Sequence, residues 1–126
     1  MINSFVDLKV WQEARDLRKE IEEISDSFPP EEKYRLKDQI IRAARSITNN
    51  LAEGFGRFHY QENIQFCRQA RRSLFEVLDH LIIALDNGYI NKEIFDKFKE
   101  KFDNELKLLN GYIEYLKDKK SEDLSK

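Results

Sequence analysis

The sequence has few of the residues that build turns, disulfides and metal sites. Its 126 residues include one cysteine, two histidines, two prolines and four glycines. A lone cysteine cannot form an internal disulfide, and scarce glycine and proline disfavour architectures made of strands and turns. Because Cys67 lies among apolar positions, we expect a buried, inert thiol rather than a nucleophile.

Motifs that carry catalytic or metal chemistry are absent from the sequence as well. A di-metal carboxylate bundle needs Glu-x-x-His pairs on two helices, and the chain has none. It has no Gly-rich phosphate loop, and its histidines and cysteine do not assemble a catalytic triad. Glu76, Asp79 and His80 are neighbours, but we expect Asp79 and His80 to face solvent. The sequence therefore predicts no enzyme activity, no metal site and no cofactor.

No apolar run in the sequence is long enough to cross a membrane. The longest run, Leu81–Leu85, has five residues, whereas a spanning helix needs roughly 20. The first seven residues have neither a basic start nor an apolar stretch of signal-peptide length. We therefore expect a cytoplasmic protein with no membrane partner.

Helical periodicity is what the sequence has in abundance. Apolar residues recur at spacings of three or four in four segments, approximately 7–25, 31–56, 60–87 and 91–119. The connections between them are too short to carry the chain back along a helix, so successive helices must be antiparallel. The predicted fold is all-α, an up-down-up-down antiparallel four-helix bundle in one domain, residues 1–120, followed by a flexible tail at 121–126.

Residues that stop or start helices mark the predicted boundaries. Pro29 and Pro30 end the first segment, since proline lacks the N–H donor that a helix interior needs. Gly88 is a natural cap after the third segment, and Asn91 suits the N-cap of the fourth.

Charge is distributed unevenly along the chain. The formal net charge is −2, yet residues 31–72 carry nine basic and five acidic side chains. Polar residues recur there at three- and four-residue steps, forming a polar stripe of Arg35, Gln39, Arg42, Ser46, Asn49, Asn50 and Glu53. Arg68, Arg71 and Arg72 form a second, compact cluster. If these groups converge they make a basic patch for a nucleic-acid backbone; the alternatives are ordinary pairing along a helix face and hydrogen bonds between subunits.

The apolar face of the third segment is wide enough to suggest a contact beyond the bundle core. Ile64, Phe75 and Ile82 lie at one edge of it, where the alternative is a simple core-edge position. Together with members of the polar stripe they give the candidate subunit contacts, which are Gln39, Ser46, Asn50, Glu53, Ile64, Phe75 and Ile82.

Several motifs resemble a known bacterial family. They are Phe5-Val-Asp-Leu8 with Val10-Trp11, Phe28-Pro29 with Glu32 and Tyr34, Gln39-Ile-Ile-Arg-Ala-Ala-Arg-Ser-Ile47, Asn50-Leu-Ala-Glu-Gly54 with Gly56-Arg57, then Phe66, Ala70, Ser73, Leu74, Glu76 and Gly88. Over about residues 5–116 the chain resembles the four-helix bundle proteins called 23S rRNA intervening-sequence proteins, or S23 ribosomal proteins.

The resemblance implies a left-turning bundle that assembles as a homopentameric barrel with a central channel and no enzyme activity. Genes of the family often lie inside inserted segments of large-subunit ribosomal RNA, which suggests RNA binding. A similar protein, the accessory protein of diversity-generating retroelements, binds nucleic acid and a reverse transcriptase through basic surfaces. The implied partners are therefore RNA or DNA, and a reverse transcriptase or a ribosomal component. By match of position, the residues implied for a nucleic-acid surface are Arg35, Arg42, Arg45, Arg57, Arg68 and Arg71.

The chain departs from the family pattern in two residues and in charge. Arg72 stands where the family usually has a close-packing Gly, which puts the local helix contact in question, and Leu51 stands where Ile is common. The net charge of −2 differs from that of a strongly basic RNA binder. The leading hypothesis is a non-enzymatic, oligomeric nucleic-acid-binding protein, and the alternative is a structural or protein-interaction module whose polar stripe serves subunit contacts.

Overall fold

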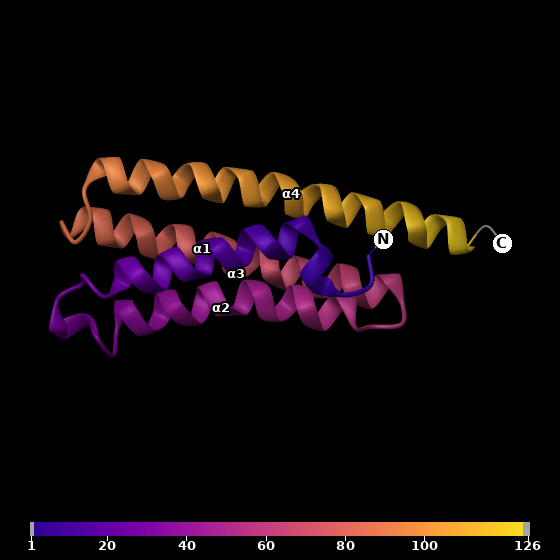
Figure 1. The fold of residues 1–126 in the computed structure, drawn as a ribbon, viewed down its shortest axis with the longest axis horizontal. Coiled ribbons are helices and arrows are strands. Elements are labelled where there is room, and N and C mark those ends of the chain that lie inside the picture. Colours follow the sequence, from indigo (N-terminus) through magenta and orange to yellow (C-terminus); the bar gives the residue numbers. More distant parts are fainter. Residues whose placement is uncertain (1, 125–126) are drawn as a thin grey trace.

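The protein, described here by a computed structural model over residues 2–124, consists of four long helices (Figure 1). The elements are η1 (Phe5–Asp7), α1 (Lys9–Ser25), η2 (Pro30–Glu32), α2 (Leu36–Phe55), α3 (Tyr60–Asp86) and α4 (Lys92–Leu124), where η marks a short 3-10 turn. No strand occurs within the described residues. Each helix packs beside the next and α4 closes the ring against α1, while within residues 2–124 the backbones of the two diagonal pairs do not come close to each other. The predicted all-α four-helix bundle is confirmed.

The segment between α1 and α2 is longer than predicted, because α2 begins at Leu36 and not at Glu31. Pro29 is extended and Pro30 starts the 3-10 turn η2, after which Arg35 still has a non-helical backbone (φ −122°, ψ −107°). The Tyr89 hydroxyl donates to Glu32 Oε2 at 2.9 Å and so ties this segment to the α3–α4 turn. The proline pair delays the helix start as well as ending the previous helix.

The turn between α3 and α4 follows the sequence prediction closely. Gly88 has φ +75°, a conformation that residues with a Cβ adopt at a cost. Asn91 Oδ1 accepts the backbone N–H of Ile94 at 2.9 Å, which is the N-cap geometry expected for α4. At its other end α4 continues to Leu124, so residues 121–124 of the predicted tail are helical, while 125–126 lie outside the described residues.

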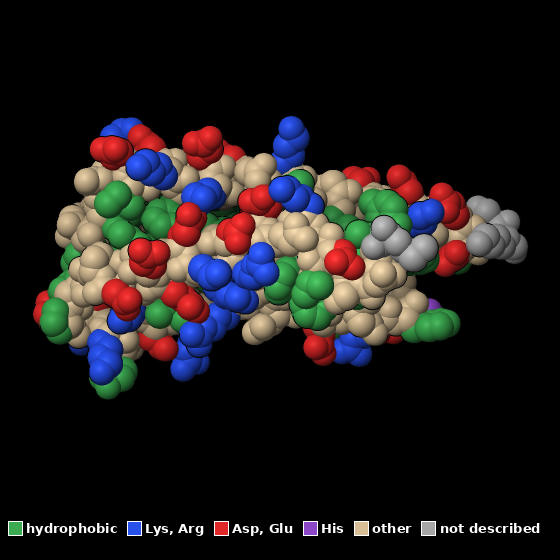
Figure 2. All heavy atoms as spheres, in the orientation of Figure 1, with side chains coloured by type: hydrophobic (Ala, Val, Ile, Leu, Met, Phe, Trp, Pro, Cys, Tyr) green, Lys and Arg blue, Asp and Glu red, His purple; other side chains and the backbone are tan. Residues whose placement is uncertain are grey.

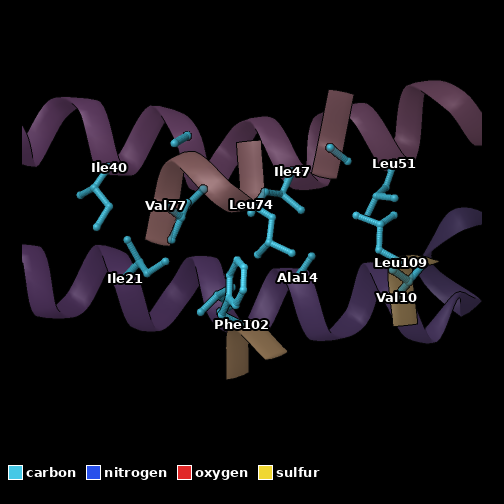
Figure 3. Close-up of a cluster of buried hydrophobic side chains, with 14 of the residues drawn as sticks. Val10, Ala14, Ile21, Ile40, Ile47, Leu51, Leu74, Val77, Phe102 and Leu109 are labelled. Carbon is cyan, nitrogen blue, oxygen red and sulfur yellow. The ribbon is translucent and has the colours of Figure 1, made fainter. Parts of the chain in front are cut away.

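All four helices contribute to one apolar core (Figure 3). Its large, fully buried side chains include Ile21, Ile40, Ile47, Leu51, Leu74 and Leu109. Cys67 is buried among them, and this burial raises the pKa of its thiol to about 12. The thiol therefore stays protonated at neutral pH, in agreement with the inert role that the sequence predicts.

The contact between α2 and α3 depends on the absence of a side chain at Gly54. A Cβ added to Gly54 would lie 2.5 Å from Asn63 Oδ1 and 2.8 Å from Phe66 Cβ. Real atoms do not approach so closely, so glycine at this position lets the two helices pack together. Arg72 does not interfere with helix packing, because its side chain is exposed.

Candidate nucleic-acid interface

The polar stripe of α2 divides into residues that pack inside the chain and residues that face solvent. Asn50 Nδ2 donates to the Ser46 carbonyl oxygen at 2.8 Å and to Ser46 Oγ at 3.0 Å. Ser73 of α3 donates its hydroxyl to Ser46 Oγ at 2.8 Å. Ser46 thus serves the α2–α3 contact within one chain, and Asn50 is bonded to Ser46 along α2, whereas Gln39 and Glu53 are exposed.

The candidate arginines of α2 lie on the side of the bundle that faces α1. Arg45 Nε pairs with Glu22 Oε1 of α1 at 2.7 Å, and Arg42 Nε pairs with Asp38 Oδ2 at 2.9 Å. Arg35, just before the helix, has no ion pair within residues 2–124. On this face Lys and Arg side chains gather over the middle of α1 and α2 (Figure 2). Because carboxylates already partner Arg42 and Arg45, their charge is partly neutralised.

The arginines of α3 lie on a different side. Arg71 Nη1 donates to Asn110 Oδ1 of α4 at 2.8 Å, which places it at the α3–α4 contact. Arg68, one turn earlier, is exposed and has no ion pair in the described part of the chain. Since Arg45 faces α1 and Arg71 faces α4, the two groups of arginines lie on opposite sides of the ring of helices. They do not converge into the single basic patch considered from the sequence.

Arg57, the remaining candidate, lies in the turn after α2. Its Nη2 is 3.2 Å from Glu53 Oε1, and its guanidinium lies 4.8 Å from the ring centroid of Phe66. This cation is therefore fixed over an aromatic face at the end of the bundle, apart from both arginine groups.

A cationic hollow that sequence reasoning missed lies between the start of α3 and the end of α4. We call it the basic groove, a hollow of about 370 Å³ to which Arg68, Lys117 and Lys120 contribute their side chains. None of its described lining residues is acidic. Lys120 Nζ donates to Gln61 Oε1 at 2.6 Å, which holds the ammonium over the groove. The partner of Lys117 is an exposed carboxylate, Glu114, at 3.3 Å.

The apolar candidates for subunit contact differ in their exposure to solvent. Ile64 is only 1% exposed and belongs to the core, so its prediction as a surface contact is wrong for this residue. Phe75 is 48% exposed, although its ring packs edge-on against the ring of Phe102 of α4, with 5.2 Å between the ring centroids. Ile82 is also exposed. Two of the three apolar candidates are thus available at the surface of α3.

His80 differs from its prediction, because it is buried rather than facing solvent. It lies seven residues, close to two helical turns, after Ser73 and therefore shares the side of α3 that packs against α2. Its Nε2 is 4.0 Å from Glu76 Oε2. Asp79, in contrast, is exposed as expected.

Glu105 is also an ionisable side chain in the interior, as are His80 and Cys67. It is 1% exposed, and neither carboxylate oxygen has a hydrogen-bond partner in the described chain. Burial, with a smaller effect from Glu13, raises its pKa to about 9, so Glu105 is protonated at neutral pH. Residues 2–124 contain no group of His, Cys, Asp and Glu side chains arranged to hold a metal ion.

Comparison with known proteins identifies the family. A sequence model of the 23S rRNA-intervening sequence protein family matches residues 6–111. The chain belongs to this family. The family resemblance found in the sequence motifs is thereby confirmed.

A solved structure shares the fold of this 23S rRNA-intervening sequence family member. It is a protein with unknown function from the S23 ribosomal protein family of Bacteroides thetaiotaomicron VPI-5482, with a TM-score of 0.76 over 82% of this chain and 97% of that chain. The two sequences are 21% identical, so the likeness supports the fold alone. No curated protein sequence matches the chain. None of the helices described here combines the length and hydrophobicity needed to cross a lipid bilayer.

Proposed function

We propose that this family member is a non-enzymatic protein that binds RNA through the basic groove. The observation that carries the proposal is the clustering of Arg68, Lys117 and Lys120 around a hollow whose described lining residues include no acid, in a chain of net charge −2. Phosphate groups bind to such local concentrations of cations, because counterions are released when the charges meet. The name of the family, which refers to an intervening sequence of 23S rRNA, favours RNA as the ligand.

The candidate arginines contribute unequally in this proposal. Arg68 is the central one, since it lines the groove and has no ion pair to break within the described residues. Arg71 lies one turn further along α3 but is already bonded to Asn110. Arg42 and Arg45 would have to leave their carboxylate partners before contacting a phosphate. We therefore place the RNA on the α3–α4 side.

Charge reversal in the basic groove is expected to weaken RNA binding. Arg68→Glu combined with Lys120→Glu should lower the affinity for a labelled RNA hairpin by more than about tenfold at low salt, because both cations become anions facing phosphate. Fluorescence anisotropy measures the effect. Lys19→Glu, at an exposed position of α1, is the matched control and should change the affinity little. Unchanged binding by the double variant, with helix content intact, contradicts the groove assignment.

We also propose that the chain assembles as a homopentamer. The supporting feature is the exposure of Phe75 and Ile82 two turns apart on one long helix, because solvated apolar side chains on one helix favour burial against another copy. The same feature suits the alternative function, a structural module without nucleic-acid binding. An intact oligomer that binds no RNA or DNA at low salt would favour that alternative.

Introducing charge at these two positions is expected to dissociate the assembly. Light scattering should give about five times the 15.1-kDa chain mass for the unmodified protein and a much smaller mass for Phe75→Glu with Ile82→Glu, since buried charges are costly. Tyr34→Glu, at an exposed tyrosine elsewhere, should leave the mass unchanged. A single-chain mass for the unmodified protein would contradict the assembly.

A further inference from the structure

Hollows surround the end of the bundle where α2 turns into α3. The last turns of α4 extend past this turn (Figure 1). A histidine side chain and hydrophobic side-chain atoms are visible on the surface at the same end (Figure 2). Of the nine large hydrophobic side chains that are exposed in the described chain, four line these hollows, namely Ile2, Phe58, Tyr115 and Leu124. Several exposed apolar side chains therefore lie together at this end of the bundle.

The largest of these hollows, of about 590 Å³, is aromatic, and we call it the aromatic hollow. Its Phe and Tyr rings come from Phe55, Phe58, Tyr60, Tyr112 and Tyr115. Phe58 is 94% exposed, and Tyr115 is 53% exposed. The rings of Tyr112 and Tyr115 are stacked, with an angle of 11° between their planes and 6.3 Å between their centroids. The volume lies in the range of roughly 300–1,000 Å³ typical of small-molecule sites.

The aromatic hollow continues into the basic groove. A third hollow of about 410 Å³ lies between them. It shares Phe58 and Tyr60 with the aromatic hollow, and Gln61 and Lys120 with the basic groove. Rings and cations thus line one continuous path around the end of the bundle.

The charge along this path is strongly one-sided. Its lining contains four Lys and Arg side chains, which are Arg57, Arg68, Lys117 and Lys120. Asp123 is the one acidic side chain among the described lining residues. A chain with more acids than bases therefore concentrates cations where it also exposes aromatic rings. This combination matches single-stranded nucleic acid, whose bases stack on rings while cations follow its phosphates.

We propose that the aromatic hollow stacks an unpaired RNA base while the basic groove holds the adjoining phosphates. Phe58 and Tyr115 are exposed aromatic side chains, and Arg57 and Lys120 lie on the aromatic and basic sides of the path. A fully paired helix keeps its bases inside the stack, so the site prefers unpaired RNA over duplex. This inference rests on the proposed function and adds the form of RNA and the place where a base binds.

The test compares a short fluorescein-labelled single-stranded RNA with a blunt-ended RNA duplex of the same length, using the full chain. Phe58→Ala combined with Tyr115→Ala should weaken single-stranded binding by about tenfold or more, because stacking on each ring contributes to affinity. Duplex binding, which depends on the basic groove, should change by less than about twofold. Tyr34→Ala removes an exposed tyrosine outside these hollows and should change neither affinity.

The possible outcomes separate the inference from the proposed function. A loss of affinity by the double variant that is confined to single-stranded RNA supports base stacking in the aromatic hollow. The inference is overturned if the variant and the unmodified protein bind single-stranded RNA equally well, or if the variant loses the same affinity for both probes. RNA binding itself stands in either case. The exposed rings would then fit an apolar segment of another protein. Absence of binding to both probes by the unmodified protein overturns the proposed function and the inference together. Phe58→Ala alone, at the more exposed position, repeats the test if the double variant loses helix content.

Discussion

The free energy of unfolding is expected to fall steeply as the pH rises from about 5 to 9. Glu105 is the cause, since burial raises its pKa from 4.5 to about 9. Between these values the folded chain keeps the proton and the unfolded chain releases it, so a higher pH favours unfolding by up to about 1.4 kcal/mol per pH unit. Below the ordinary pKa both states are protonated, and the stabilisation is fully present there.

Glu105→Gln isolates this effect, because the amide cannot ionise. Relative to the unmodified protein, the variant should gain about 4 kcal/mol of stability between pH 5 and pH 8, as measured by urea unfolding at both values. Glu100→Gln removes an exposed carboxylate from the same helix and should show no such gain. If the free energy of unfolding changes with pH in the same way for Glu105→Gln and the unmodified protein, Glu105 is not protonated in the folded chain.

Enlarging Gly54 is expected to destabilise the bundle. In Gly54→Val the Cβ alone would come within 2.5 Å of Asn63 Oδ1 and 2.8 Å of Phe66 Cβ, so α2 and α3 must separate. Overpacking of a core contact costs about 1–3 kcal/mol and occasionally more. We expect a value near the upper end, measured as the change in the free energy of unfolding, because the backbone oxygen of Asn63 is also close, at 3.3 Å.

Gly111 provides the matched control for Gly54. It lies in α4, and a Cβ added there meets no atom within 4 Å. Gly111→Ala should therefore stabilise the chain by about 0.5–1 kcal/mol through helix propensity alone. If Gly54→Val and Gly111→Ala changed the free energy of unfolding equally, the close α2–α3 contact would be contradicted.

Local signals in the sequence were sufficient to predict the helices and several of their ends. Gly88 and Asn91 act through their own backbone and side chain, so their roles could be read without knowledge of the fold. The start of α2 at Leu36 could not be predicted in this way. Glu31 and Glu32 resemble a helix start, but the prolines before them set a 3-10 turn.

The burial of Glu105 had a signal in the sequence that its charge obscured. It lies three residues after Phe102 and four before Leu109, both buried, and so fits the apolar spacing of α4. Its carboxylate nevertheless suggested a place at the surface. His80 had the same signal, because it lies three residues after Val77 and four before Ala84, both buried.

The candidate site could be predicted only in part, since it depends on residues that are far apart in the chain. Arg68 was a candidate from its match to the family. Lys120 joins it because α4 returns antiparallel to the start of α3, where Lys120 bonds Gln61 across 59 positions of sequence. No local pattern reveals such a pairing, and the polar character of the last residues suggested a solvated tail.

The most direct test of RNA binding by the basic groove is the salt dependence of affinity for a short single-stranded RNA. Anisotropy titrations of the unmodified protein at several salt concentrations give the slope of log K against log salt. If Arg68, Lys117 and Lys120 of the basic groove each contact a phosphate, the slope should be about −2. A slope near zero, or no binding at the lowest salt concentration by protein that is folded and assembled, would contradict the account.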